Sequence, residues 1–309
     1  MFSEVPTEHR DDRPRDPGPR IVDDGPDAPI MPPLTRILCL VSTEPSTSAA
    51  LRHAVHQACA LGAGLYAVPR REMPADAVRR AARRVASSEC RNALDLHVEA
   101  PVSSSAALVE TLRSYVQDLA VDLVVTGTPT DRGPIPPLAD PPTQALLEGL
   151  PCSVLAAGEI APAPPRRFLL PTDLSDATPP ALDCATVLAP LYDASIELLH
   201  VIEATPYVAL TPVDRLSLSG PSFPERRARR HLDAFLEAPD APVPIEPHVA
   251  YGDPVDQISR FVNRHDVDLM VLPARRERTP PRSSLGSVTD RVLRRVACPV
   301  LLARPRPSS

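Results

Sequence analysis

Short apolar runs alternate along the chain with longer stretches in which apolar residues recur at helical spacing. The runs RILCLVS (36–42) and GLYAVP (64–69) are typical of buried strands, and residues 46–61 between them follow the helical spacing. The alternation continues with strands predicted near 94–99, 121–127 and 152–157 and helices over 104–119 and 142–149. Strands that alternate with helices in this way predict a parallel sheet with helices on both faces.

The same pattern occurs a second time. The segment AVDLVVTG (120–127) matches DVDLMVLP (266–273), and LPCSVLAA (150–157) matches VACPVLLA (296–303), both 146 positions later. Near the start of each copy, RILCLVS matches RFLLPTD 131 positions later, so the second copy is 15 residues longer in its middle. A Pro- and Ser-rich stretch at 205–224 supplies this length and is expected to be a loop. The second copy predicts strands near 167–172, 195–202, 245–251, 268–272 and 299–303.

The repeat predicts an α/β fold of two tandem doubly wound domains, each with a five-stranded parallel sheet and helices on both faces. The expected divisions are a disordered acidic, Pro-rich tail (1–33), a first domain (34–158), a Pro-rich linker (159–166) and a second domain (167–304). The last strand of each copy is a short apolar edge that needs covering. Pairing 152–157 with 299–303 would cover both and make an intrachain pseudo-dimer. The alternative is pairing between chains.

Composition narrows the classes of function. Hydrophobic residues make up 43% of the chain but aromatic ones only 3%, so aliphatic side chains must fill the cores. The net charge is −6, of which the first 33 residues carry −4, so the remainder predicts no surface for nucleic acid. All 33 basic residues are Arg, which leaves no Lys for Schiff-base chemistry. The Arg-rich stretches 78–85 and 225–232 are expected to be solvated helix faces, the alternative being a contact with an acidic partner or nucleic acid.

Cysteine and histidine positions indicate no metal or catalytic site. The six cysteines form no CxxC and no zinc-like spacing, which predicts buried, reduced thiols in a cytoplasmic protein. The first 20 residues contain no apolar signal region, and no run approaches the roughly 18 apolar residues of a membrane span. His200 and His248 lie in strand-like runs and are expected to be core or edge histidines, because no second ligand has a useful spacing. No catalytic motif is present, so no enzyme is predicted.

Four segments of the second copy carry a family resemblance. They are FLLPTDLSDATPPALDCATVLA, IELLHVIE, VAYGDPVDQISRFVNRHDVDLMVL and LGSVTDRVLRRVACPVLLA. In order and spacing they resemble the universal stress protein family, nearly continuously over 167–303. The first copy resembles the same domain more distantly over 34–158, so the chain as a whole resembles a tandem universal stress protein.

The resemblance implies a nucleotide site in the second copy. It implies that Asp173 meets the ribose of an adenine nucleotide, that the backbone at Val201 meets adenine, and that Gly286-Ser287 holds phosphate at a helix start. The full set of binding residues that it implies is Pro171, Thr172, Asp173, Val201, Gly286, Ser287 and Val288.

The sequence departs from the family pattern in the phosphate loop. Pro273 and Arg276 stand where the family's first two loop glycines should fall, so a backbone donor and two permissive φ angles are lost. Side chains of Arg275, Arg276, Arg278 and Arg282 could bind phosphate instead, or could form a solvated basic loop.

The first copy departs further from that pattern. Ser42 takes the aspartate position, Thr130 takes the second glycine after the retained Gly127, and Asp140-Pro141 replaces Gly-Ser. An acidic residue at that helix start would repel phosphate, so this half is expected to be structural or partner-binding.

The sequence therefore predicts a non-enzymatic stress-response or regulatory protein. It requires no cofactor, and its expected ligand is ATP or another adenine nucleotide, bound weakly in the second domain. Its expected partners are that nucleotide and a second copy or another protein, with no nucleic acid and no membrane. The alternative is an adenine-nucleotide-hydrolysing enzyme with the same fold.

Overall fold

The structure is a computed structural model, and it describes eleven stretches of the chain. They are residues 34–41, 46–70, 73–90, 93–102, 107–127, 141–157, 165–203, 223–236, 243–274, 286–296 and 298–304. Several predictions lie outside these residues: the tail 1–33, most of the linker 159–166 and of the loop 205–224, Ser42, Thr130, Asp140 and the arginines at 275, 276, 278 and 282.

The described residues of the first half form five strands and four helices in strict alternation. They are β1 (Arg36–Val41), α1 (Ser46–Leu61), β2 (Gly64–Pro69), α2 (Ala75–Glu89), β3 (Leu96–Val98), α3 (Leu108–Asp118), β4 (Leu123–Gly127), α4 (Pro141–Gly149) and β5 (Ser153–Ala157). Every strand predicted from the apolar runs is present. The third is shorter than expected, which fits its pairing with a neighbour, β2, on one side only.

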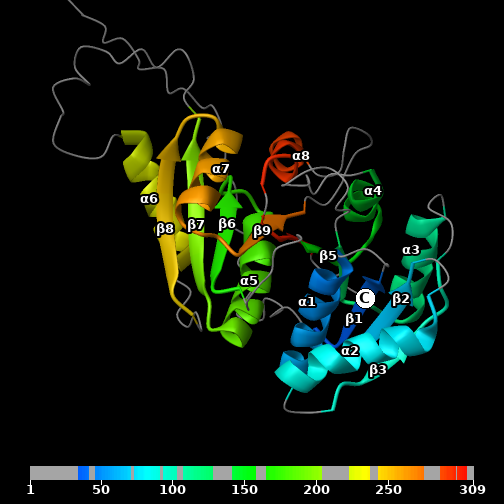
Figure 1. The fold of residues 1–309 in the computed structure, drawn as a ribbon. Coiled ribbons are helices and arrows are strands. Elements are labelled where there is room, and N and C mark those ends of the chain that lie inside the picture. Colours follow the sequence, from blue (N-terminus) through cyan, green and yellow to red (C-terminus); the bar gives the residue numbers. More distant parts are fainter. Residues whose placement is uncertain are drawn as a thin grey trace, which may run out of the picture. The chain divides into compact units, whose positions relative to one another are not determined.

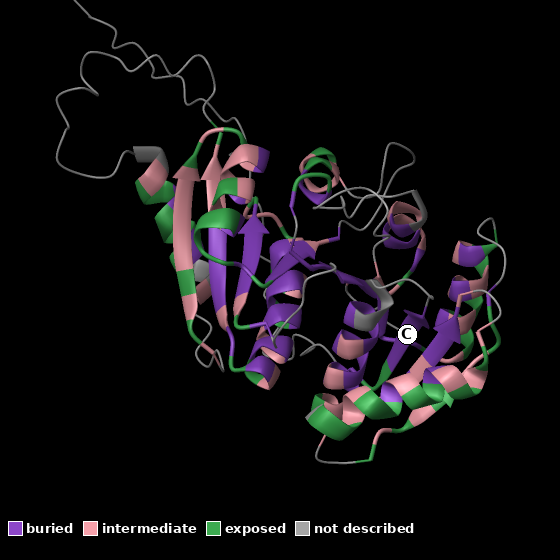
Figure 2. Ribbon diagram, viewed as in Figure 1, coloured by how far each residue is buried: buried purple, intermediate pink, exposed green. Residues whose placement is uncertain are grey.

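The second half repeats this series. It contains β6 (Arg167–Thr172), α5 (Thr178–Tyr192), β7 (Ser195–Ile202), α6 (Phe223–Leu236), β8 (Ile245–Tyr251), α7 (Pro254–Arg264), β9 (Leu269–Pro273), α8 (Ser287–Leu293) and β10 (Val300–Ala303). The Arg-rich stretches fall on α2 and α6, which occupy equivalent places, and their outward faces are exposed (Figure 2).

The strands form one ten-stranded sheet in the order β3-β2-β1-β4-β5-β10-β9-β6-β7-β8 (Figure 1). Neighbouring strands within each half are parallel, and both halves have the same order when read from the outer edge inward. This confirms the α/β class with two doubly wound halves. Both halves belong to one compact unit, Met31–Ser309.

An antiparallel pairing of β5 with β10 joins the two halves. Leu155 is the register partner of Leu301, and these residues are 146 positions apart, which makes them equivalent members of the repeat. Val154 pairs with Leu302 and Ala156 with Val300 in the same symmetric manner. An interface in which each residue meets its own counterpart has local two-fold symmetry. The predicted intrachain pseudo-dimer, with 152–157 paired to 299–303, is therefore confirmed.

Helices α4 and α8 meet above this pairing through polar side chains. The Nε2 group of Gln144 donates to Oδ1 of Asp290 at 3.3 Å, and Nη2 of Arg294 donates to Oε1 of Gln144 at 3.3 Å. Gln144 and Asp290 are again 146 positions apart. The local two-fold axis therefore passes between two equivalent residues that differ in charge.

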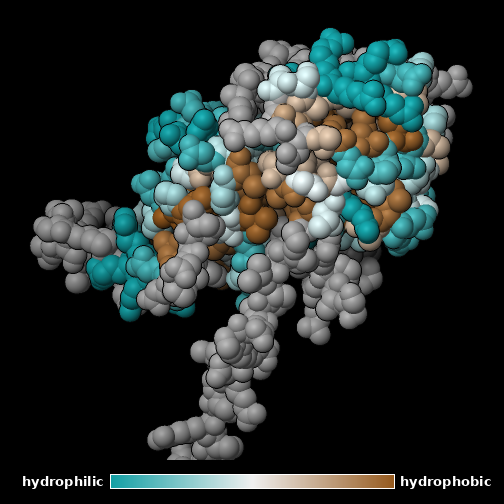
Figure 3. Space-filling model, turned by 90° about the horizontal axis from the view of Figure 1, so that it is seen from below, coloured by the Kyte–Doolittle hydropathy of each residue, from teal (hydrophilic) through white to brown (hydrophobic). Residues whose placement is uncertain are grey.

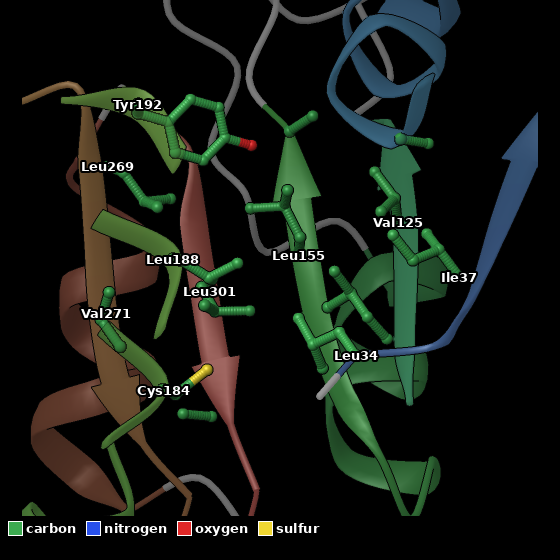
Figure 4. Close-up of a cluster of buried hydrophobic side chains, with 14 of the residues drawn as sticks. Leu34, Ile37, Val125, Leu155, Cys184, Leu188, Tyr192, Leu269, Val271 and Leu301 are labelled. Atoms are coloured by element: carbon green, nitrogen blue, oxygen red, sulfur yellow. The ribbon is translucent and has the colours of Figure 1, made fainter. Parts of the chain in front are cut away.

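Two hydrophobic layers cover the two faces of the sheet, and both continue from one half into the other. Buried residues of α1, α2, α5 and α6 pack on one face, and those of α3, α4, α7 and α8 pack on the other. Figure 4 shows part of the first layer, where Leu155 and Leu301 lie beside Leu188 and Tyr192 of α5. The side chains are aliphatic almost throughout, as the low aromatic content predicts.

An aspartate fixes the start of the central strand in each half. Oδ2 of Asp122 accepts hydrogen bonds from the backbone N–H groups of Thr35 and Arg36 at 2.7 and 3.0 Å. Oδ2 of Asp268 accepts from the two equivalent N–H groups that open β6, at 2.8 and 3.0 Å. Charged acceptors of this kind make strong hydrogen bonds, so the duplicated frame is held by the same contacts in both copies.

The expectation of reduced thiols is wrong for two cysteines. Cys59, near the end of α1, forms a disulfide with Cys90 at the end of α2, with a Cα–Cα distance of 5.4 Å. The sequence gives no hint of this pair, because the two residues are 31 positions apart and meet only when the two helices pack together.

The other four cysteines are free thiols. Cys39, Cys184 and Cys298 are buried and Cys152 is half-buried. Burial raises the pKa of each of these thiols to about 12. They are therefore packing residues rather than nucleophiles, as the sequence analysis expected of buried cysteines.

No helix of the described residues combines the length and apolar character needed to cross a membrane. Apolar groups are visible between hydrophilic ones on the face drawn in Figure 3, which is usual for folded proteins. Among the described residues the one large hydrophobic side chain that is exposed is Tyr251, at 45%.

Candidate functional site

A pocket of 360 Å³ opens in the second half, where three parallel strands end. Its walls are the carboxyl ends of β6, β7 and β9 and the first turns of α7 and α8. The chain leaves β6 towards β7 on one side and returns to β9 on the other. Ligands of open α/β sheets bind at such a switch point.

All seven residues implied by the family resemblance line this one pocket. They are Pro171, Thr172 and Asp173 at the end of β6, Val201 on β7, and Gly286, Ser287 and Val288 at the start of α8. These segments are up to 117 positions apart in the sequence, and the fold brings them to one end of the sheet.

The turn after β6 presents Asp173 at the mouth of the pocket. Oγ1 of Thr172 accepts a hydrogen bond from the N–H of Leu174 at 2.8 Å and lies 2.7 Å from Oγ1 of Thr178. Oδ1 of Asp173 accepts from the N–H of Ser175 at 3.1 Å. Such an aspartate turn orients the carboxylate while leaving it exposed. An exposed, oriented carboxylate is suited to accept hydrogen bonds from hydroxyl groups of a ligand.

Gly286 has a conformational role at the other wall. Its φ and ψ angles are 78° and 152°, and a Cβ atom added there would meet no atom within 4 Å. The glycine is therefore needed for its positive φ and not for close packing. The first intrahelical bond of α8 runs from the N–H of Asp290 to the carbonyl of Gly286, so the N–H groups before Asp290 have no partner within the helix.

Pro273 removes a donor from the same wall. It is the last residue of β9, lines the pocket and has no backbone N–H. The predicted companion departure, Arg276, lies outside the described residues.

The described lining of the pocket carries negative charge. It includes the carboxylates of Asp173 and Glu203, and no arginine is among these residues. Asp253 directly precedes the lining residue Pro254 and caps α7 by accepting from the N–H of Asp256. This bond, assisted by Arg291 at 3.1 Å, lowers the pKa of the Asp253 carboxyl. Arg291 is therefore already paired with a carboxylate, and a bound phosphate would have to compete for it.

His200 lines the pocket and links two strands there. Its Nδ1 atom lies 2.9 Å from the carbonyl oxygen of Thr172. Because a carbonyl can only accept, Nδ1 must carry the proton. This agrees with its expected role as an edge or core histidine.

In the first half, fewer residues are described at the carboxyl ends of the corresponding strands. Val41 and Gly127 end the corresponding strands, and α4 begins at Pro141. The residues that carry its departures from the family pattern, Ser42, Thr130 and Asp140, are outside the described ranges.

Sequence reasoning missed one polar cluster. The side chains of Glu197, Glu246 and His248 converge on β7 and β8, with candidate ligand atoms all within 4.8 Å of one another. Spacing along the chain could not reveal it, because the two strands are separated by the insertion and α6. The signal that was available is the alternation of Glu246 and His248 on one face of a predicted strand.

Comparisons with known proteins match the second half of the chain to a family. Residues 165–304 match the model of the universal stress protein family. A universal stress protein of Methanocaldococcus jannaschii is 27% identical over 139 residues, which cover 45% of this chain and 82% of that protein.

Solved structures extend the likeness of fold to both halves. The crystal structure of a putative universal stress protein from Pseudomonas aeruginosa UCBPP-PA14 has a TM-score of 0.67 at 18% identity and covers 88% of this chain and 94% of its own. That of a universal stress protein from Archaeoglobus fulgidus has a TM-score of 0.64 at 13% identity, covering 87% and 98%. The second half of the chain therefore contains a universal stress protein domain, and the likeness of fold extends over both halves.

Proposed function

We propose that the protein is a non-enzymatic regulatory module that binds an adenine nucleotide weakly in the pocket of its second half. The observation that carries the proposal is the convergence of all seven implied residues on one pocket of 360 Å³. A pocket of this size at the switch point of an α/β sheet is suited to a small organic ligand.

The polar groups match the parts of a nucleotide. The Asp173 carboxylate is suited to ribose hydroxyls, and the β7 backbone at Val201 is suited to the edge of adenine. The N–H groups of Ser287 and Val288 are suited to phosphate oxygens. Because α8 is only seven residues long, these individual donors rather than a helix dipole would supply the attraction.

Two features of the pocket lining explain why binding should be weak. Pro273 offers no N–H, and the carboxylate of Glu203 repels a polyphosphate. A lost charge-assisted hydrogen bond is worth roughly 1.5–3 kcal/mol, so one lost bond weakens affinity about tenfold or more. We therefore expect a dissociation constant for ATP of micromolar or weaker.

Titration calorimetry with Mg-ATP on the full chain tests this proposal. Wild type should bind in or above the micromolar range, and Asp173→Ala should bind at least tenfold more weakly. Asp233→Ala is the matched control, since Asp233 is exposed on α6 and away from the pocket lining.

Two results would contradict the proposal. Binding that is unaffected by Asp173→Ala would mean that the site is elsewhere, and nanomolar binding would mean that the lost donor is replaced. Release of phosphate from ATP that disappears in Asp173→Ala would favour the enzymatic alternative.

A further inference from the structure

A second polar site lies on the outer part of the sheet, away from the nucleotide pocket. Glu197 of β7 is the register partner of Glu246 of β8, and His248 lies two residues further along β8. Residues two apart on a strand share a face, so the three side chains gather on the face covered by α7. None of the three lines the pocket.

The distances fit a small cation. Nε2 of His248 lies 2.6 Å from Oε2 of Glu197 and 4.0 Å from Oε1 of Glu246. Tetrahedral zinc with bonds of about 2.0–2.1 Å places neighbouring ligand atoms about 3.3 Å apart. The two observed separations lie on either side of that value, so small side-chain movements would open room for the ion. We propose that Glu197, Glu246 and His248 form a binding site for a divalent transition-metal ion of the Zn²⁺ class.

Charge and burial support a cation between these groups. Glu197 is 7% exposed, and a second carboxylate stands directly opposite it on the neighbouring strand. Like charges in this arrangement destabilise a sheet unless something compensates them. Nε of Arg167 lies 3.6 Å from Oε1 of Glu197 and compensates that oxygen, while Oε2 faces His248. A metal ion would take the place of the hydrogen bond between His248 and Oε2.

The surrounding residues hold the histidine and leave an entry path. The ring of Phe261 meets the ring of His248 edge-on at 4.9 Å, and the same Phe261 ring stacks on His265 at 4.0 Å. Arg167 donates to the backbone carbonyl of His265, which ties the end of α7 to the start of β6. The side chain of Glu246 is 71% exposed, so an ion can reach the site from solvent. Three protein ligands leave the fourth position of zinc to water.

The first half provides a natural control. The register places Tyr66 and His97 at the positions equivalent to Glu197 and Glu246, and their rings stack at 4.9 Å. His97 also lies 3.1 Å from the carboxylate of Asp95. An edge-strand histidine with an acidic neighbour is therefore present in both halves, but the set of three ligands is assembled only in the second.

Titration of the metal-free full-length protein with Zn²⁺ tests the proposal. Wild type should show a saturable site that is at least tenfold weaker in His248→Ala and in Glu246→Gln, and unchanged in His97→Ala. Glu246 is exposed, so its variant remains informative if His248→Ala fails to fold. Co²⁺ in place of Zn²⁺ should give an absorption spectrum typical of nitrogen and oxygen ligands.

The inference would be overturned by any of three results. One is the absence of saturable Zn²⁺ binding to wild type. Another is equal affinity in wild type, His248→Ala and Glu246→Gln, which would indicate adventitious binding only. The third is a thiolate-to-cobalt charge-transfer band, because it would place the ion at one of the four free cysteines.

Discussion

The two halves of the chain share a frame and differ in what the frame carries. Both have the same strand order, and both use an aspartate to fix the start of the central strand. Even the positive φ angles recur: Gly62 and Asp193 are equivalent, with φ of 65° and 53°, and so are Ala120 and Asp266, with φ of 48° and 46°. Backbone geometry has thus been retained where side chains have changed.

The differences lie in functional groups. The second half has the described pocket and the acid–histidine cluster, whereas the first half has the disulfide and a buried histidine, His53. The residue equivalent to His53 in the second half is Cys184, which is also buried. The comparison teaches that the two halves share the contacts that hold the sheet together, while each half has its own polar groups.

The largest expected effect comes from the pairing that joins the halves. Leu155 and Leu301 are each 1% exposed, and replacing either one by Ala should lower the free energy of unfolding by about 2–5 kcal/mol. If the pairing is symmetric, the two costs should agree within about 1 kcal/mol, and because the residues are neighbours the double variant should not be additive. Urea unfolding followed by circular dichroism measures this.

Leu94→Ala is a matched control for that pair. Leu94 is a half-buried leucine near the outer part of the first half, and its replacement should lower the free energy of unfolding by less than either of those replacements does. Costs below about 1 kcal/mol for both Leu155→Ala and Leu301→Ala would mean that the pairing does not stabilise the protein.

The disulfide in the first half should stabilise the protein. Closing a loop with a sequence separation of 31 between Cys59 and Cys90 restricts the unfolded chain, an effect worth about 3–4 kcal/mol. A reductant should lower the denaturant midpoint of wild type by a corresponding amount and leave Cys59→Ser/Cys90→Ser unchanged. Thiol titration of the denatured, unreduced protein should detect the four free cysteines. Detection of all six would refute the bond.

Acid should affect the first half through His53. Burial, assisted by the nearby charges of His56 and Arg52, lowers the pKa of His53 from 6.5 to about 4. As the pH falls below 6.5, His53 therefore takes up a proton in the unfolded state before it does so in the folded state. The free energy of unfolding then decreases by about 3 kcal/mol between pH 6.5 and pH 4. His53→Cys, which copies the second half, should remove this loss, while His231→Ala on the exposed face of α6 should not. Identical pH profiles for wild type and His53→Cys would contradict the prediction.

Much of the fold is encoded in local patterns. The apolar runs at 64–69 and 195–202 coincide with β2 and β7, because buried parallel strands need continuous apolar residues. The pairing of β5 with β10 follows from two apolar edges that require cover. The meeting of Asp173 with Gly286 was expected only from the family resemblance, since nothing local links residues that far apart.

What the sequence could not predict depends on lateral packing. The Cys59–Cys90 bond needs the ends of α1 and α2 to meet, and the cluster around Glu197 needs β7 and β8 in a particular register. Register is set by the burial of a whole strand face, so one residue type at one position does not reveal its cross-strand neighbours.

The contact between Gln144 and Asp290 has a consequence for how such an assembly can change over time. In a dimer of two identical second halves, Asp290 would face its own copy across the axis, and two carboxylates would repel each other. Within one chain the partner of Asp290 is the neutral amide of Gln144. Each position at the axis can therefore differ from its counterpart, and no residue has to face an identical copy of itself. Covalent linkage also replaces concentration-dependent association with a fixed effective concentration, so dilution cannot separate the halves. Each side of the interface is thereby free to diverge, and the asymmetry seen elsewhere in the molecule can accumulate without loss of pairing.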